Sequence, residues 1–386
     1  MALELSKIAE QVGEIGRDLA AGAERRRQVL PALRELRRLY AHDLERLQAL
    51  AEAAGEKAKC ARPTHEPLDA AFPAPAPPDR ATILAADGSQ IYPDPHGWAL
   101  YYLINVGSLV YRHGSGQTPE AASAPMVAQA VDAEGNLLAG ERIDARRDVA
   151  EVQRLAELCE AEAGDEPLVA LLDSTLGLRA WSAAIPQAEQ AALQQSFDVQ
   201  MECVRQAGAA LAGFLSRSRR AGVVCLLDLA QSVETGEARS EPSPFQGLTD
   251  QMLWGDLQHG ERSALLVEAS EPPVYFFYLN TEPVDGPHLP DIETEPARIE
   301  LPEWVALSPE KLRWVHSLVY DQSRLNNGYP YVLTRADELA IILNEEREAL
   351  ETMLLQAMIH QGLSLPRLSP KERQKRVARA PFRRRL

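Results

Sequence analysis

The chain has few cysteines and no long apolar run. Its four cysteines are widely spaced without a C-x-x-C pair, which excludes zinc ribbons and thioredoxin-like redox motifs; three are expected to be small core residues. Apolar stretches such as residues 223–227 are far shorter than a bilayer span, so no segment is expected to cross a membrane. The first residues lack the basic patch, apolar run and cleavage site of a secretory signal, which favours a cytoplasmic protein.

Basic charge is also scarce, except at one end. The chain has 40 Lys and Arg against 56 Asp and Glu, a formal charge of −16, which is atypical of a protein that binds nucleic acid on its own. Nine basic residues nevertheless lie between Arg367 and Leu386, with Glu372 as the only acid. A hydrophobic content of 45% is typical of soluble globular proteins. We therefore expect a globular protein with a basic C-terminal tail over residues 362–386.

The N-terminal part of the chain predicts helices followed by a linker. Residues 1–58 are good helix formers with an apolar stripe at alternating three- and four-residue steps, and Pro31 suggests two helices or one kinked helix. This helical hairpin either packs on its own domain or contacts a second copy or another partner. Residues 59–80 carry six prolines among alanines and predict a semi-rigid linker.

Residues 81–361 predict one α/β domain. Strands that read as unbroken apolar runs between helices imply a sheet covered on both faces, and the first strands form an antiparallel meander. The predicted order is β-β-β-α-β-α-β, followed by a hairpin and two helices. The expected strands are 82–87, 100–111, 126–131 with 137–143, 167–173, 222–228, 263–269 and 274–280, and the expected helices are 145–163, 187–216, 309–325 and 334–361.

Carboxylates follow several of the predicted strands. Asp87, Asp173 and Asp228 each end one, and a carboxylate at the end of an apolar strand is costly unless it is paired or coordinates an ion. Taken singly, each of them is better explained as a cap of the next turn or helix. The helix after the meander adds Glu151 and Glu157, so Asp87, one glutamate and Asp173 are expected to converge. Such an oxygen cluster suits Mg²⁺ or Mn²⁺ and the in-line hydrolysis of a phosphate ester.

Several segments, in this order, resemble the NurA nuclease family over residues 81–360. They are Ala86–Gln90, Leu171–Leu176, Ala212–Arg219, Gly260–Ser263, Phe276–Leu279 and Asn327–Tyr331. The resemblance implies an RNase H-like fold and a Mn²⁺-dependent exonuclease and endonuclease activity on DNA. It also implies a homodimer with a central channel and a partnership with the hexameric ATPase HerA in end resection during double-strand break repair.

The resemblance also assigns candidate metal-binding and catalytic residues. The two catalytic aspartates of the family fall on Asp87 and Asp173. The catalytic glutamate falls on Glu151, which we prefer, if the Arg147-x-x-x-Glu151 phrase is the anchor, or on Glu157 if distance to the second aspartate is the guide. The family tyrosine falls on Tyr329. The family histidine, eight residues further on, is replaced by Asp337. An aspartate can replace the imidazole as an oxygen ligand for Mn²⁺ or Mg²⁺; the alternative is an aspartate in the first helical turn, favoured by the helix dipole.

Other polar residues are weaker candidates. His316 is expected to be a packed or surface residue, although it could orient substrate, and Asp228 is expected to be structural. Ser89 and Ser174 are expected in turns. The arginines at the end of the predicted helix 187–216 either contact DNA phosphates or neutralise the helix C-terminus; they are Arg217, Arg219 and Arg220.

Two other functions remain open at this level. Loss of the family histidine favours a dimeric adaptor that docks on the ATPase without cutting DNA. The segments Asp87–Ser89 and Asp173–Thr175 also resemble the phosphate loops of an actin-like ATPase, but no second copy of the sheet and no adenosine loop follow. The basic tail is either a solvated end, an extension of the DNA path or a contact with the ATPase.

Overall fold

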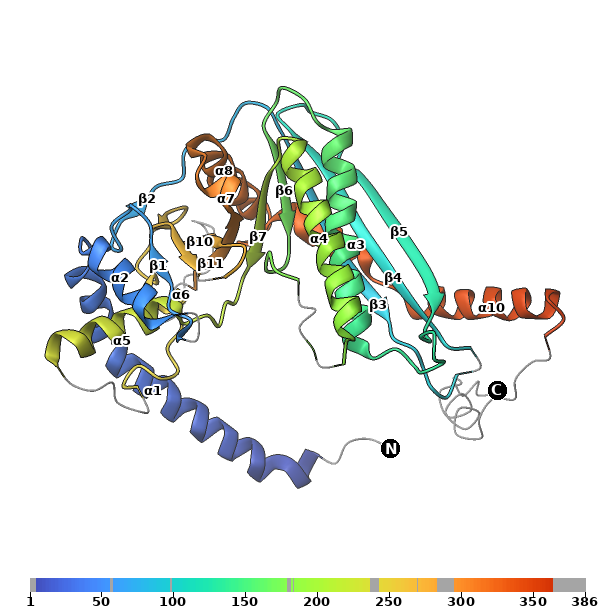
Figure 1. Cartoon of the computed structure of the whole chain (residues 1–386), viewed down its shortest axis with the longest axis horizontal. Helices are drawn as coiled ribbons and strands as arrows, with labels where there is room; N and C mark the ends of the chain where they lie inside the picture. The colour runs from blue at the N-terminus through green and yellow to red at the C-terminus, as the bar shows by residue number, and fades with distance from the viewer. Residues whose placement is uncertain are drawn as a thin grey trace, which may run out of the picture. The chain divides into compact units, whose positions relative to one another are not determined.

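The computed structural model describes residues 5–55, 58–97, 99–178, 182, 184–236, 243–268, 270–282 and 295–363 (Figure 1). The chain forms two compact units, which are described separately. The first comprises Met1–Pro78, Ser174–Leu176 and Ala210–Tyr331, and the second comprises Asp79–Asp173, Gly177–Ala209 and Val332–Leu386. The basic tail lies outside the described residues from position 364 onward.

The helices of the first unit lie in the first and the last of its three chain segments. A 3-10 turn at Leu5–Ile8 leads into α1, which continues through Pro31, so the break falls at residues 40–43 and not at the proline. The other helices of this unit are short to medium in length. The bounds are α1 Ala9–Leu39, α2 Leu44–Ala54, α5 Gly222–Thr235, α6 Asp250–Leu253, α7 Glu303–Ala306 and α8 Pro309–Arg324.

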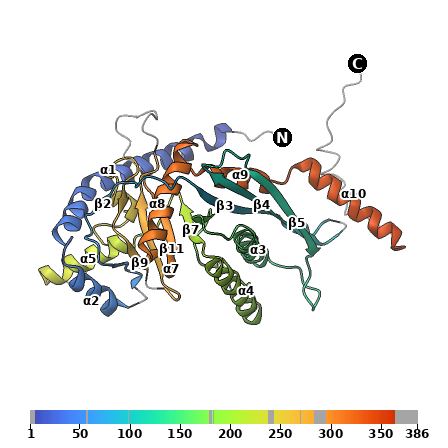
Figure 2. The same cartoon turned by 90° about the horizontal axis from the view of Figure 1, so that it is seen from above.

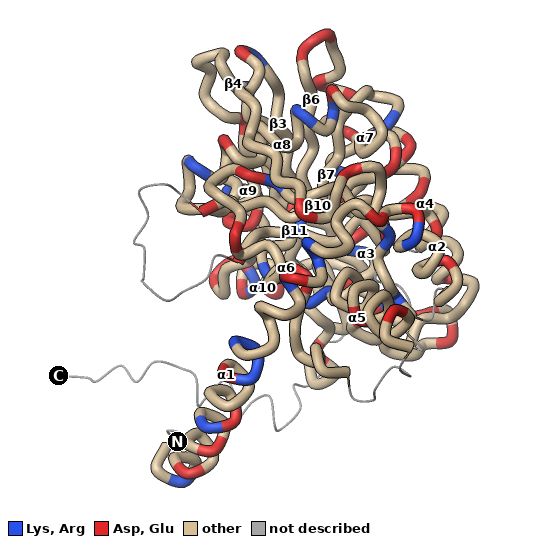
Figure 3. Tube along the Cα trace, turned by 90° about the vertical axis from the view of Figure 1, so that its left-hand side faces the viewer, with Lys and Arg blue, Asp and Glu red and all other residues tan. Residues whose placement is uncertain are grey.

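The two halves of α1 have different environments. Leu30 and Leu33 in the second half are buried in one apolar cluster with residues of α2 and α5, which explains why Pro31 does not end the helix. In the first half, Val12, Ile15 and Leu19 are 57–66% exposed, and Figure 3 shows this half projecting from α5 and α6. Packing on its own unit therefore accounts for the second half of α1 only.

The sheet of the first unit is antiparallel. Its strands are β1 Arg62–Pro63, β2 Ala71–Phe72, β7 Ala210–Leu215, β8 Arg262–Ser263, β9 Leu266–Glu268, β10 Val274–Leu279 and β11 Ala297–Pro302. The pairing order is β1-β9-β10-β11-β7, and β8 pairs with both β2 and β10. Residues 59–80, which the sequence predicts as a linker, thus contribute two short strands.

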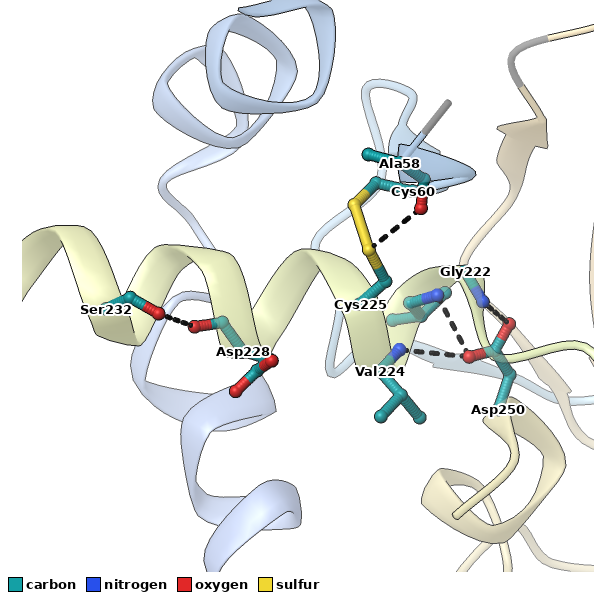
Figure 4. Close-up of a disulfide and its surroundings, with 9 residues drawn as sticks. Ala58, Cys60, Gly222, Val224, Cys225, Asp228, Ser232 and Asp250 are labelled. Atoms are coloured by element: carbon teal, nitrogen blue, oxygen red, sulfur yellow. Dashed lines mark hydrogen bonds between the residues drawn. A yellow bond between two sulfur atoms is a disulfide. The ribbon is translucent and has the colours of Figure 1, made fainter. Parts of the chain in front are cut away.

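The strand predicted at residues 222–228 is wrong, because these residues begin α5. A short apolar run does not distinguish a buried helix from a buried strand. Here the carboxylate of Asp250 accepts hydrogen bonds from the backbone N–H groups of Gly222, Val223 and Val224 at 2.9–3.0 Å, and these donors are unpaired at the start of a helix (Figure 4). Asp228 consequently lies within α5, where it is buried, and does not end a strand.

The helix predicted over residues 187–216 is also wrong in its last third. It ends as α4, Gln187–Gln206, and Gly208 then adopts a φ of +81° in the turn before β7. Glycine adopts such a positive φ without steric cost, so it ends the helix and redirects the chain. The last strand of the predicted order is therefore β7.

Two of the cysteines form a disulfide, which the sequence reading did not anticipate. Cys60 and Cys225 are bonded with their Cα atoms 5.3 Å apart, so that the segment before β1 is tied to the first turns of α5 (Figure 4). Cys159 and Cys203 are free. Only the fold brings together two residues separated by 165 positions, and for this reason spacing along the chain gave no sign of the bond.

Alkylation of the denatured protein tests this bond. Without reductant, iodoacetamide is expected to label Cys159 and Cys203 only, and after reduction all four cysteines, as read by peptide mass spectrometry. A Cys225→Ser variant should add Cys60 to the residues labelled without reductant. Labelling of Cys60 in the unreduced wild-type protein would contradict the bond.

The second unit has a four-stranded mixed sheet. Its strands are β3 Ala81–Ile91, β4 Tyr101–His113, β5 Glu120–Gln129 and β6 Leu168–Leu172. The order is β6-β3-β4-β5, with β3 parallel to β6 and antiparallel to β4, which is antiparallel to β5. Of the predicted strand at 137–143, one bridge between Val131 and Leu137 is present, because α3 begins at Gly140.

Helices cover both faces of this sheet. α3, Gly140–Ala161, and α4 lie on one face, and α9, Tyr331–Ala340, lies on the other (Figure 2). The single long helix predicted at 334–361 is interrupted at residues 341–343 and continues as α10, Asn344–His360. Along the chain the elements follow the predicted order β3-β4-β5-α3-β6-α4-β7, and the fold is an RNase H-like mixed α/β fold. None of the helices formed by the described residues has the length and apolar character to span a bilayer.

Candidate metal centre

Asp87 lies inside β3 and not at its end, because the strand continues to Ile91. Successive residues of a strand point to opposite faces of the sheet. Asp87 and Ser89 therefore share one face, and Gly88 points to the other. The expectation that Ser89 lies in a turn is wrong, since it is paired with Asn105 of β4.

Asp173 is brought to Asp87 by the parallel pairing of β3 and β6. Ala86 is the partner of Leu172 in this ladder, so that Asp87 and Asp173 each directly follow a paired residue. Parallel neighbours run in the same direction, and their next residues therefore emerge at the same level of the sheet. The prediction that these two aspartates come from adjacent strands agrees with this arrangement.

Asp337 approaches the same place from α9. It lies in the middle of this helix, whose first turn contains no acidic residue, so the alternative of a helix-dipole aspartate is wrong. A side-chain hydrogen bond joins Asp337 to Asp87. Burial raises the pKa of Asp87 to about 6, with the negative charges of Asp173 and Asp337 adding to the shift and the Gly88 N–H opposing it.

Glu151 reaches β3 from the opposite face of the sheet. It is buried on α3, and a Cβ at position 88 would lie 2.7 Å from its Oε1, so that only glycine permits this approach. Glu157, two turns further along, is exposed and pairs with Arg154 at 3.2 Å. Of the two glutamates that the sequence left open, Glu151 is the one beside the strand of Asp87.

Arg147 holds the Glu151 carboxylate, a role that sequence reasoning missed. Its Nε lies 3.1 Å from Glu151 Oε1, while its other nitrogens donate to Gln90 Oε1 and Asp148 Oδ1, each at 2.9 Å. The nearby carboxylates raise the pKa of Arg147 against the effect of burial. The Arg147-x-x-x-Glu151 phrase was used only as an anchor of the resemblance, although its four-residue spacing places the two side chains on one side of a helix and is the signal of the ion pair.

Tyr329 belongs to the first unit, whereas the four carboxylates belong to the second. Its ring packs edge-on against Phe214, with ring centroids 5.1 Å apart. The preceding residues Asn327 and Gly328 both have positive φ values and form the turn before α9. The structure therefore gives Tyr329 a packing role within its own unit.

The weaker candidates have structural surroundings. His316 is buried in α8, where its Nε2 lies 2.8 Å from the carbonyl oxygen of Gly260, and burial lowers its pKa to about 4. The arginines predicted at a helix end instead follow β7. Arg217 lies 4.0 Å from Glu295, and Arg220 lies 3.6 Å from Glu268.

The donors near Asp87 fit a hard divalent cation. In the described part of the chain, no group of three acidic, histidine or cysteine side chains is arranged as a finished metal site. Burial is the main cause of the raised pKa of Asp87, and the negative charges of Asp173 and Asp337 add to it, so the three carboxylates lie close enough to interact. Carboxylate oxygens of this kind are the ligands that Mg²⁺ and Mn²⁺ prefer, and a bound cation would offset their repulsion.

Comparison with known proteins identifies the family of this chain. The sequence profile of the NurA domain family matches residues 81–342. The chain belongs to the NurA domain family. No curated protein sequence matches it.

Three solved structures are similar to this chain to different degrees, and the first of them shows the same fold. The NurA nuclease from Sulfolobus solfataricus is similar with a TM-score of 0.54 and 12% identity, covering 95% of this chain and 100% of that one. The catalytic domain of human Endonuclease V is matched with a TM-score of 0.34 and 15% identity, over 71% of this chain and 83% of that one. LC9-RNase H1 is matched with a TM-score of 0.23 and 17% identity, over 43% and 76%.

Proposed function

We propose that this protein is a metal-dependent DNA nuclease that hydrolyses phosphodiester bonds as an exonuclease and endonuclease. The observation that carries the proposal is the juxtaposition of Asp87, Asp173 and Asp337 on one side of an RNase H-like sheet. Membership of the NurA family and the likeness to the Sulfolobus nuclease support it.

Each carboxylate has a role in this proposal. Asp87, Asp173 and Asp337 would hold Mn²⁺ or Mg²⁺, which when bound supplies Lewis acidity toward the scissile phosphate. Glu151, whose carboxylate Arg147 holds, packs at Gly88 on the other face of β3 from Asp87, so its role as proton acceptor for the attacking water or as a ligand is proposed on the resemblance alone. Burial excludes part of the bulk water from Asp87 and strengthens electrostatic interactions at that point. Tyr329 is retained as a candidate for substrate contact on the resemblance alone.

The proposal extends to partners. An acidic chain is poorly suited to capture DNA by long-range attraction, and delivery of the strand by a motor, bound metal ions and a dimeric channel would each offset this. We therefore include a HerA-type hexameric ATPase as partner, a homodimer as the working form, and DNA end resection in the cytoplasm as the setting.

A nuclease assay tests this function. The wild-type protein is expected to degrade linear double- or single-stranded DNA with Mn²⁺ or Mg²⁺ and to stop when EDTA is added. Asp87→Asn keeps the shape of the side chain and removes a metal-binding charge, so it should be inactive under the same conditions. Equal residual cleavage by both proteins would indicate contamination, and would leave an adaptor of the ATPase as the function.

A further inference from the structure

The C-terminal turn of α9 is docked directly on strand β4. At Gly107 a Cβ would lie 2.5 Å from the backbone nitrogen of Ala340 and 2.8 Å from the carbonyl carbon of Leu339, and it would also overlap Ala336 O. These are backbone atoms, which cannot move aside as a flexible side chain can. The helix therefore rests on the strand only because position 107 has no side chain.

Asn105 fixes the same turn with hydrogen bonds. It is 7% exposed, and its Nδ2 donates to the carbonyl oxygens of Leu339 and Ala340, each at 3.0 Å. Ser89, its partner on β3, donates from Oγ to Ala340 O as well. Carbonyl groups at the end of a helix lack partners within it, so these side chains satisfy acceptors that would otherwise be buried and unpaired.

These contacts lie in register with the aspartate cluster. Gly107 is the direct partner of Asp87 in the β3–β4 ladder, and Asn105 is two residues away on the same face. Asp337 is one helical turn before the docked residues, and its carbonyl accepts from Ile341 N at 3.1 Å. A shift of this turn therefore moves the Asp337 carboxylate relative to Asp87.

We infer that Asn105 and Gly107 are positioning residues that set the separation of Asp337 from Asp87. The hydrogen bonds of Asn105 and the close approach at Gly107 are to the backbone of α9, so these residues act through the helix. Their effect on metal binding and catalysis rests on the proposed function, whereas the docking itself rests on the contacts described above.

Two substitutions and one control test the inference. Gly107→Ala introduces the overlap with Ala336, and Asn105→Leu removes both donors at similar size. Gly164→Ala is the matched control, because a Cβ at that position meets nothing within 4 Å. Each variant is compared with the wild-type protein by hydrogen exchange of the peptide covering residues 332–341, by calorimetric titration with Mn²⁺ and by DNA cleavage kinetics.

Both test variants are expected to exchange faster in that peptide and to bind Mn²⁺ about 10–100-fold more weakly, which is the usual effect of residues that orient ligands. They should lower kcat with KM for DNA nearly unchanged, while Gly164→Ala behaves as the wild type. Faster exchange with unchanged Mn²⁺ affinity, or unchanged exchange, overturns the inference. If Gly107→Ala does not fold, Ser89→Ala takes its place. It removes one of the donors to Ala340 O and should change hydrogen exchange, Mn²⁺ affinity and kcat in the same direction by a smaller factor.

Failure of the proposed function gives a different pattern. A wild-type protein that neither binds Mn²⁺ nor cleaves DNA would disprove the nuclease. Faster exchange in the two variants would then still show that these residues dock α9.

Discussion

Replacing Glu151 by glutamine is expected to lower the rate of DNA cleavage by about 100-fold or more, the range found when a group that transfers a proton is removed. The substitution keeps the size of the side chain and changes only its charge. Arg147 retains its bonds to Gln90 and Asp148, so the guanidinium is not left unpaired in the interior. The measurement is kcat with Mn²⁺ on a linear substrate, with circular dichroism to confirm folding.

Glu157→Gln is the matched control for this substitution. Glu157 lies on the same helix two turns later, but it is exposed and its ion pair with Arg154 is at the surface. Surface ion pairs contribute little to stability, so this variant should cleave DNA within about twofold of the wild-type rate. A larger loss in Glu157→Gln than in Glu151→Gln would reverse the assignment and restore the alternative that spacing along the chain leaves open.

The aspartates of the candidate centre were predictable because the regular pairing of neighbouring strands brings them together. Asp87 and Asp173 come from strands that the sequence places next to each other, and their parallel pairing puts them at one level. Only the folded structure distinguishes Glu151 from Glu157. Both lie on one helix, and Glu151 is buried whereas Glu157 is exposed. The docking contacts of α9 were not predictable, since Gly107 and Asn105 have no motif and act through backbone atoms more than 200 positions away.

The errors in the fold have a common physical origin. The stretch from Gly222 to Asp228 has the composition of a buried strand, and its first N–H groups donate to Asp250, which lies 26–28 residues further along the chain and stabilises the start of a helix. Likewise the disulfide of Cys60 and Cys225 joins distant segments. Local patterns predicted the order of the elements well, whereas contacts between distant residues decided which of two locally acceptable structures formed.

Without metal, Asp87→Asn is expected to be more stable than the wild-type protein at neutral pH. The folded pKa of Asp87 is about 6, above its ordinary value of 3.8, so between these values the folded protein binds more protons than the unfolded chain. The wild type therefore loses stability as pH rises through this window, and the loss is complete above pH 6. Asparagine carries no charge and escapes this penalty. A shift of this size corresponds to roughly 3 kcal/mol at most, and screening at this partly exposed side chain reduces the expected gain to about 1–2 kcal/mol.

Thermal unfolding in EDTA between pH 4 and pH 8 measures this effect. The difference between Asp87→Asn and wild type should increase up to about pH 6 and then stay constant, while Asp165→Asn, at an exposed position of the same unit, should follow the wild type. Added Mn²⁺ should stabilise the wild type in proportion to the logarithm of its concentration above Kd and leave Asp87→Asn nearly unchanged. A wild-type protein more stable than Asp87→Asn at pH 8 without metal would show that Asp87 is compensated within the protein, and that its charge is not available to hold a cation.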